Sequence, residues 1–472
     1  MMQPSRGPSR FDRAYRAGVT AELPAPTVAS DTAARELSVR TAPVEAIALQ
    51  GCVLTPDGPI EDGYVVVGSG QRIQAVQAGQ PQGVRVHPTG GVILPGLIDL
   101  HGHPEFNVFA AWDPPRRFPN RYSWRASSIY RALVRDPQNR LLDAGLGATE
   151  LRYAEIRALV GGVTAIQGAS GRTRSTEEAL VRNVDLRIFG RHRARAMIDL
   201  PSPTSRDAAR LKDIVAGIGR GEIDAFYLHL AEGQAGDERS AKEFGRLIDY
   251  DALTPATVLI HGTALTREQL GQVKAAGAKL VWSPQSNLRL YEQTTLAGEA
   301  IALGIPVGLG ADWLPSGSTS LLAELKVAAR TLALQGHPQP PRQLVDMVTS
   351  TAAHIAGLAD QLGVLAADRP ADLLVLERNH SDPYQNVVAA DPSWVELVMV
   401  DGDLAYGRAD WLSALTDPAD QDRFEPVLAW AKPMLLDTSY RAHPTSPTAP
   451  PTLARLRADL ITHHPPVGPI FA

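Results

Sequence analysis

The sequence predicts an α/β fold: a distorted (β/α)8 barrel flanked by a small β domain that is built from both ends of the chain. In the middle of the chain, short and nearly continuous apolar runs alternate with amphipathic helical stretches, which is typical of a parallel sheet covered on its faces. Runs of β character separated by glycine-containing turns lie on both sides of that region. The length of 472 residues suits one large barrel with an accessory domain.

The N-terminal part divides into two segments. Residues 1–45 are rich in Pro, Ser, Ala and Arg without periodicity, so we expect an extension lying on the surface. Residues 46–96 contain three β-type runs, AIALQGCVL, GYVVVGSGQRIQAV and VRVHPTGGVIL. Their glycine-containing turns predict a small antiparallel β unit.

Residues 97–363 form the predicted barrel. Its helices include amphipathic stretches at Arg267–Ala276 and Leu321–Leu334. Two weaker strands, near Arg187–Phe189 and Arg195–Leu200, bring the strand number towards that of a (β/α)8 barrel. The clearest strands are Leu97–Leu100, Gly162–Gln167, Phe226–Leu230, Val258–Ile260, Lys279–Trp282 and Pro306–Gly310.

Strand character returns after the barrel. Residues 364–412 contain ADLLVLER and VELVMVDGDLAYG, which we expect to complete the first β unit. Residues 413–472 include the Pro-rich stretch HPTSPTAPPTLARL and predict a C-terminal extension that wraps the surface or contacts another subunit.

Composition excludes several classes of protein. The single cysteine rules out an intrachain disulfide and a cysteine-rich zinc module. A net charge of −5 gives no reason to expect nucleic acid or an anionic membrane as partner. Because the sequence has neither an apolar run of membrane-spanning length nor a secretory h-region, we expect a cytoplasmic protein that acts on a small molecule.

The strongest local signal is the segment Asp99-Leu-His101-Gly-His103, directly after an apolar strand. Residues two apart on a strand point to the same side, so both imidazoles can face one point at the strand's carboxyl end. Barrel enzymes keep their active sites at that end, and paired imidazoles are good ligands for zinc or iron.

Three further strands end in side chains of the same kind. His229 and His261 each close a strand-like run, Asp312 follows another, and Glu232 lies three residues beyond His229. Taken singly, each of these residues could have a purely structural role. Together, at the same end of one architecture, they favour a metal site.

Five segments surround these residues: ILPGLIDLHGHPE at 93–105, HLAE at 229–232, LIHG at 259–262, WSPQSNLRL at 282–290 and VGLGADWLPSGS at 307–318. They resemble the amidohydrolase superfamily, and more closely its cytosine deaminase, guanine deaminase and triazine hydrolase branch. The resemblance covers about residues 46–410 and implies a distorted TIM barrel flanked by a β-sandwich from both chain ends.

The resemblance also implies roles for individual residues. The residues that match the metal ligands are His101, His103, His229 and Asp312. Glu232 resembles the catalytic acid/base, and His261 the residue that contacts the metal-bound hydroxide. Asp312 would also accept a proton from the metal-bound water, so it is predicted both as a metal ligand and as a catalytic residue. Zn²⁺ is the expected ion, with Fe²⁺ as the alternative, and dimers are common in this family.

Scarcity of lysine indicates one metal ion. Dinuclear members of the superfamily bridge two metals with a carboxylated lysine or a glutamate after the fourth strand. Of six lysines, only Lys212 lies between the second strand and His229, and its surroundings predict a helix rather than a strand end. Glu177 and Glu178 are placed at a helix start and Glu222 in a turn, so we expect one divalent ion per chain.

Candidate substrate-binding residues come from two regions. The long insertion after the first strand, from Glu105 to about residue 140, carries aromatic and arginine side chains suited to a planar or anionic ligand. Segments after the seventh and eighth strands lie at the same mouth, although a structural role explains their polar side chains as well. The predicted contacts are Trp112, Arg117, Asn287, Trp313 and Ser316.

The sequence thus predicts a metal-dependent hydrolase of a C–N bond, acting by deamination on a small heterocycle. The alternative within enzymes is a cyclic amide, imide or dipeptide-type hydrolase similar to imidazolonepropionase, which would release a carboxylate instead of ammonia. A non-catalytic scaffold on the same fold is the alternative of another class. It predicts eroded ligand positions, whereas every ligand position is filled in this sequence.

Overall fold

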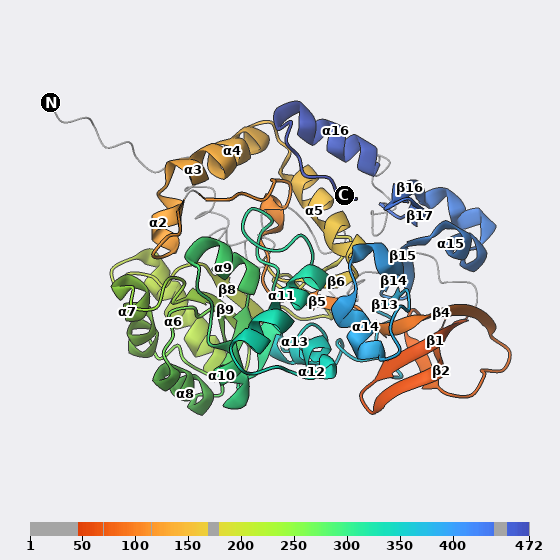
Figure 1. The fold of residues 1–472 in the computed structure, drawn as a ribbon, viewed down its shortest axis with the longest axis horizontal. Coiled ribbons are helices and arrows are strands. Elements are labelled where there is room, and N and C mark those ends of the chain that lie inside the picture. The colour runs from red at the N-terminus through yellow and green to blue at the C-terminus, as the bar shows by residue number, and fades with distance from the viewer. Residues whose placement is uncertain (1–45, 69, 115, 169–178, 439–450, 472) are drawn as a thin grey trace, which may run out of the picture.

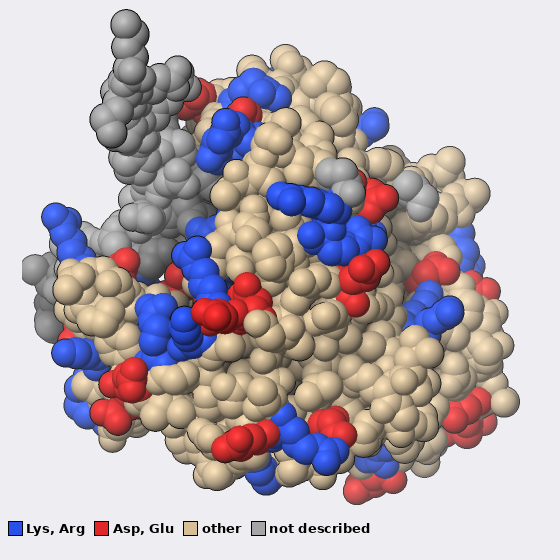
Figure 2. All heavy atoms as spheres, turned by 60° about the vertical axis from the view of Figure 1, so that its left-hand side comes forward, with Lys and Arg blue, Asp and Glu red and all other residues tan. Residues whose placement is uncertain are grey.

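The computed structural model describes residues 46–68, 70–114, 116–168, 179–438 and 451–471 (Figure 1). The N-terminal extension predicted for residues 1–45 lies outside the described residues. Among the described helices, none combines the length and the apolar character that crossing a bilayer requires. On the face shown in Figure 2, basic and acidic side chains are interspersed over the described surface rather than gathered by sign.

The centre of the molecule is a TIM-barrel-like α/β arrangement of parallel strands. Two hydrogen-bonded sheets have the orders β5-β6-β7 and β12-β11-β10-β9-β8, and every pairing within them is parallel. Almost all residues of these strands are buried, which explains their continuous apolar sequence. The strands are β5 (Leu97–Asp99), β6 (Val163–Ile166), β7 (Arg182–Asn183), β8 (Ala194–Met197), β9 (Ala225–Leu230), β10 (Thr257–His261), β11 (Lys279–Trp282) and β12 (Val307–Leu309).

One predicted strand is misplaced. Residues 187–189 do not form the third strand of the series; β7 lies earlier, at Arg182–Asn183, where it pairs with β6. The segment after it turns back on itself, because Ile188 and Arg191 form an isolated antiparallel bridge. Phe189 and Gly190 have φ values of 50° and 74°, the left-handed backbone of a tight turn.

Helices follow the strands and cover their outer side (Figure 1). The two helical stretches predicted from periodicity are confirmed as α8 and α11. Thr266 and Gln269 form a capping box at the start of α8, and Ser320 caps α11. The helices of this region are α5 (Gly147–Val160), α6 (Arg206–Gly219), α7 (Glu238–Asp249), α8 (Arg267–Ala275), α9 (Pro284–Tyr291), α10 (Ala297–Ala302), α11 (Leu321–Leu334), α12 (Pro341–Asp346) and α13 (Ser350–Ile355).

Strands from both ends of the chain join in one nine-stranded sheet of order β16-β17-β15-β14-β13-β4-β1-β2-β3. The joint is the antiparallel pairing of β4 with β13. The first β unit was expected to be antiparallel, but β1 and β4 pair in parallel. The sheet also continues past residue 412, because β17 pairs with both β15 and β16. Its strands are β1 (Ile47–Thr55), β2 (Gly58–Val67), β3 (Ile73–Gln77), β4 (Arg85–Pro95), β13 (Leu373–Leu376), β14 (Val395–Val400), β15 (Asp403–Arg408), β16 (Glu425–Ala429) and β17 (Lys432–Leu436).

A buried arginine ties the two parts together. The guanidinium of Arg182, on β7, donates two hydrogen bonds of 2.7 and 2.9 Å to the carboxylate of Asp372, directly before β13. It donates a third, of 2.7 Å, to Asp401 after β14. The Arg182 side chain is fully buried, so the charge depends on these carboxylates.

Asp372→Ala is therefore expected to lower the free energy of unfolding by about 3–5 kcal/mol, because it leaves a buried guanidinium short of its main partner. Urea denaturation of the purified protein measures the loss. Asp360→Ala is the matched control: Asp360 pairs with Arg191 at the surface, where an ion pair contributes about 0–1 kcal/mol. Equal losses in the two variants would contradict the role of the buried pair.

A long insertion follows β5 and lies across the carboxyl ends of the strands. Its helical elements are η1 (Pro104–Phe106), α2 (Arg121–Arg125), α3 (Ser128–Tyr130), a π-helical stretch η2 (Arg131–Arg135) and α4 (Asp136–Asp143). Near the C-terminus, α16 (Leu453–His463) packs beside α5 and α4 (Figure 1). The insertion thus forms one wall of the space above the strand ends.

Candidate active site

The four predicted ligand side chains meet at the carboxyl ends of three strands. His101 and His103 follow β5, His229 lies at the end of β9, and Asp312 follows β12. The Nε2 atoms of His101 and His103 are 3.1 and 3.6 Å from Oδ1 of Asp312. The ring centroids of His101 and His229 are 4.8 Å apart. Candidate ligand atoms of His101, His103 and His229 lie within 4.8 Å of one another, as do those of His101, His261 and Asp312.

Backbone contacts hold two of the ligand segments together. Oδ1 of Asp99 accepts hydrogen bonds from the backbone N–H groups of His101 (3.2 Å) and Ala311 (3.1 Å). Gly310 permits the close approach, because a Cβ at that position would lie 2.4 Å from the Cβ of His101. Asp312 has a φ of 60°, a left-handed conformation that Asp tolerates better than most residues.

These side chains fit a divalent metal. The Nδ1 atoms of His101 and His229 are buried and, within the described part of the chain, have no hydrogen-bond partner. Burial and nearby histidines lower the pKa of His103 to about 3 and that of His229 well below its usual value, so both imidazoles are neutral. Burial alone would raise the pKa of Asp312, but the histidines outweigh it and keep the carboxylate ionised. Neutral imidazoles with a carboxylate are a donor set for zinc or iron.

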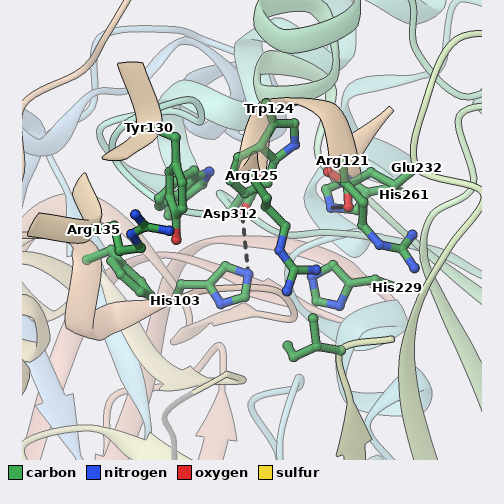
Figure 3. A pocket seen from close by; sticks show the side chains of 13 residues that line it. His103, Arg121, Trp124, Arg125, Tyr130, Arg135, His229, Glu232, His261 and Asp312 are labelled. Atoms are coloured by element: carbon green, nitrogen blue, oxygen red, sulfur yellow. Dashed lines mark ion pairs between the residues drawn. The ribbon is translucent and has the colours of Figure 1, made fainter. Parts of the chain in front are cut away.

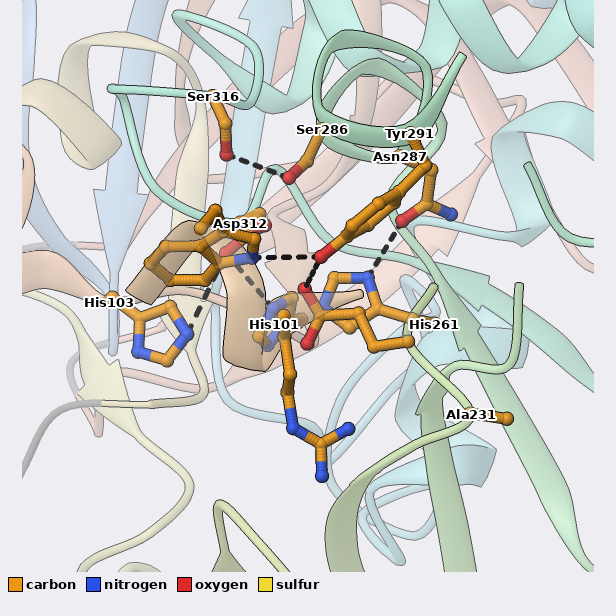
Figure 4. Close-up of polar contacts among 12 residues, drawn as sticks. His101, His103, Ala231, His261, Ser286, Asn287, Tyr291, Asp312 and Ser316 are labelled. Carbon is orange, nitrogen blue, oxygen red and sulfur yellow. Dashed lines mark hydrogen bonds and ion pairs between the residues drawn. The ribbon is translucent and has the colours of Figure 1, made fainter. Parts of the chain in front are cut away.

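Glu232 is held beside this cluster by a chain of hydrogen bonds (Figure 4). The indole N–H of Trp124 donates to the hydroxyl of Tyr291 at 2.8 Å, and that hydroxyl donates to Oε1 of Glu232 at 2.5 Å. The other carboxylate oxygen of Glu232 is 3.7 Å from Nε2 of His261. Glu232 is buried and points into the pocket, as the predicted acid/base must.

His261 is oriented by Asn287. Nδ1 of His261 is 2.9 Å from Oδ1 of Asn287. The Asn287 amide group donates to the hydroxyls of Thr294 and Thr295, which identifies Oδ1 as its free acceptor. The Nδ1 of His261 must then carry the proton, and its Nε2 keeps a lone pair facing the metal cluster.

One pocket is lined by His103, His229, His261, Asp312 and Glu232 (Figure 3). Aromatic rings form its wall, with the ring centroids of Trp124 and Trp313 5.3 Å apart. Three arginines, Arg121, Arg125 and Arg135, also face it. The complete lining is His103, Phe106, Arg121, Trp124, Arg125, Tyr130, Arg135, Ile198, His229, Glu232, His261, Asp312 and Trp313.

Of the five residues predicted to contact substrate, one lines this pocket. Trp313 lines the pocket, and Asn287 contacts His261 behind it. Trp112 packs against Trp313 with a centroid distance of 6.1 Å, outside the lining described above. Ser316 is buried and shares a hydrogen bond of 2.8 Å with Ser286. Arg117 is partly exposed, 3.5 Å from Asp113.

Sequence reasoning missed several residues of the pocket. Tyr291 and Arg135 carry no motif. The folding of the insertion brings Arg135 to the pocket lining, and the folding of α9 brings the Tyr291 hydroxyl to Glu232. Asp199 is the carboxylate that follows β8, the fourth parallel strand, but it is paired with Arg121 and Arg125 at 3.0 Å each. Lys212 is exposed on α6, in agreement with its predicted helix.

Part of this chain is similar in sequence to known proteins. Residues 191–405 match the model of the Amidohydrolase family. A curated protein from Teredinibacter turnerae, named 5-methylthioadenosine/S-adenosylhomocysteine deaminase, is 25% identical over 347 residues, which cover 65% of this chain and 76% of that protein.

Solved structures share the fold at low sequence identity. The triazine hydrolase from Arthobacter aurescens has a TM-score of 0.60 and 19% identity, covering 76% of this chain and 94% of its own. An adenosine deaminase from Xanthomonas campestris with bound zinc has a TM-score of 0.58 and 17% identity, covering 76% and 92%.

Proposed function

Residues 191–405 of this chain belong to the amidohydrolase family, and from this premise we propose that it is a metal-dependent hydrolase that releases ammonia from a small heterocyclic amine. The observation that carries the proposal is that His103, His229, His261, Asp312 and Glu232 line one pocket, with Nε2 of His101 3.1 Å from Oδ1 of Asp312. The deaminase relative, similar over most of its length, supports the reaction class.

The proposed metal ligands are His101, His103, His229 and Asp312, with Zn²⁺ preferred to Fe²⁺. A divalent ion bound by them would supply Lewis-acid activation of a water molecule. Asp312, whose carboxylate the neighbouring histidines keep ionised, would accept a proton from that water. His261, with its Nε2 lone pair turned to the cluster, accepts a hydrogen bond from the attacking group.

Glu232 is proposed to move the proton from water to the substrate. Its carboxylate lies between the His261 ring and the hydroxyl of Tyr291. Glu232 would pass one proton of the water to a ring nitrogen, which makes the ring carbon more electrophilic. The second proton of the water, accepted by Asp312, would go to the amino group so that ammonia leaves.

The eight parallel strands belong to two hydrogen-bonded sheets, and their closure into one barrel is a proposal. We propose that the eight parallel strands close into a distorted barrel over residues 97–363. The Leu100 amide donates to the Leu309 carbonyl at 3.2 Å, and the Asp312 amide donates to the His101 carbonyl at 2.8 Å, which supports closure between β5 and β12. Residues 46–96 with 364–412 would form the flanking β-sandwich, and 413–472 the extension. Cytoplasmic location and a homodimer stay predictions from the sequence.

The reaction is tested by measuring ammonia release from aminated purines, pyrimidines and triazines by the metal-loaded protein, with cyclic amides in a parallel assay. Ammonia from a heterocyclic amine supports deamination. A new carboxylate from a cyclic amide without ammonia would instead establish the second candidate function, cyclic amide hydrolysis, which the same metal cluster can carry out. The absence of turnover in both assays by fully metallated protein would contradict both.

One metal per chain is expected at full activity, because Lys212 is on an exposed helix surface and Asp199 is engaged by two arginines. Elemental analysis of the active enzyme after removal of loosely bound ions measures the ratio. Two equivalents per chain, both required for turnover, would overturn this expectation.

Tyr291→Phe is expected to lower kcat by about 10- to 100-fold, because Glu232 loses a charge-assisted hydrogen bond worth about 1.5–3 kcal/mol. Metal content should be unchanged. Tyr250→Phe is the matched control, since the Tyr250 hydroxyl donates to the Pro201 carbonyl outside the pocket. Wild-type turnover in Tyr291→Phe would show that Glu232 does not depend on this contact.

A further inference from the structure

We propose that the pocket selects a substrate that carries an oxyanion group, a carboxylate or a phosphate, and that Arg135 binds this group. The inference rests on the proposed function, because it concerns the part of the substrate that lies away from the reacting ring. The pocket contains three arginines, which differ in their ion-pair partners.

Two of the arginines already have carboxylate partners. Arg121 is buried and is paired with Asp199 and Glu243, each at 3.0 Å. Arg125 is paired with Asp199 at 3.0 Å. These pairs neutralise charge within the protein and fix the position of α2. Neither arginine needs a substrate anion to compensate its charge.

Arg135 has a different environment. Its Nε atom is buried and has no hydrogen-bond partner among the described residues, and its side chain is only 21% exposed. The nearest carboxylate is that of Asp136, at 3.8 Å and half exposed to solvent. A buried guanidinium N–H without a hydrogen-bond partner is costly, and the planar fork of arginine matches the two oxygens of a carboxylate or phosphate.

The local helix geometry directs Arg135 to the pocket. Residues 131–135 form a π-helical stretch, in which the amide of Asp136 donates to the carbonyl of Arg131, five residues before it. In an α-helix of 3.6 residues per turn, positions five apart point in different directions. The wider turn places Tyr130 and Arg135 on one side, and both line the pocket. Such single π-turns occur frequently at functional sites.

The aromatic wall supplies the complementary half of the site. Tyr130 has its ring centroid 5.1 Å from that of Trp124 and 6.0 Å from that of Trp313. In the view of Figure 3, Arg135 and Tyr130 are drawn to the left of His103, and Arg121 is drawn to its right. A flat ring packed on this wall can face the metal cluster while an oxyanion on its substituent reaches Arg135.

The test uses the metal-loaded enzyme and two sets of probes: adenosine with its 5′-carboxylic acid and 5′-monophosphate, and the three corresponding cytidine compounds. Ammonia release gives kcat/KM for each, and quenching of tryptophan fluorescence gives binding without turnover. Arg135→Gln removes the charge. Arg131→Gln is the matched control, since Arg131 belongs to the same π-helical stretch but is exposed and outside the pocket lining.

The anionic probes should bind about 10- to 100-fold more tightly than their neutral partners, and Arg135→Gln but not Arg131→Gln should remove that preference. The ratio of carboxylate to phosphate binding identifies which oxyanion fits. Equal binding of neutral and anionic probes, or an equal effect of Arg135→Gln on both, would overturn the proposal. Retained anion preference without ammonia release would refute the proposed deamination and leave the role of Arg135 supported.

Discussion

Glu232→Gln is expected to reduce kcat by about 10²–10⁴-fold, the usual contribution of a positioned general acid/base. The amide keeps the size of the side chain and can still meet the Tyr291 hydroxyl at Oε1, so the pocket should retain its shape. It cannot accept a proton and pass it to the substrate. Steady-state ammonia release and metal analysis of the same preparation measure the two quantities.

The matched control for this variant is Glu238→Gln on α7. Glu238 is exposed and paired with Lys242 at 3.1 Å, so neutralising it should leave turnover within about twofold of wild type. Full turnover by a Glu232→Gln enzyme that has kept its metal would remove the proposed role. Loss of metal together with activity would instead assign Glu232 to the metal cluster.

His229→Ala is expected to lower bound metal far below one equivalent per chain and to abolish ammonia release, since it removes one of the three proposed imidazole ligands from the cluster. It should also lose the stabilisation that metal gives the folded state, which is about 2.7–4.1 kcal/mol at 100 to 1,000 times the dissociation constant. Thermal denaturation with and without added Zn²⁺ measures that difference.

A surface histidine provides the comparison. His463 is exposed at the end of α16, so His463→Ala should keep wild-type metal content, activity and response to Zn²⁺. If His229→Ala retains a full equivalent of metal and the same increase in melting temperature, His229 is not a ligand.

The site residues at the strand ends could be predicted from the sequence because each lies at the end of an apolar run. His101, His229 and His261 each end or follow such a run, and parallel strands bring their carboxyl ends to one edge. The short β7 was misplaced for a related reason. Its two residues carry too little periodicity to distinguish them from the turn at Phe189 and Gly190.

Residues whose role depends on where the folded protein places their side chains could not be predicted from strand ends. Tyr291 is 59 residues from Glu232 in the sequence, and only the packing of α9 brings its hydroxyl to the carboxylate. Arg135 depends on a π-turn, which has no sequence signature comparable to a capping box. Arg117, which composition favoured, instead lies near Asp113 and Glu292, at 3.5 and 4.0 Å.

The pairing of β4 with β13 has a consequence for the synthesis of the chain. One edge of β4 has β1 as its neighbour, but the other receives its partner only when residues 373–376 have left the ribosome. Until then a buried apolar strand exposes unpaired backbone groups, a known route to aggregation. Nascent chains halted just before residue 373 should therefore engage chaperones or aggregate, although all four proposed metal ligands are already translated.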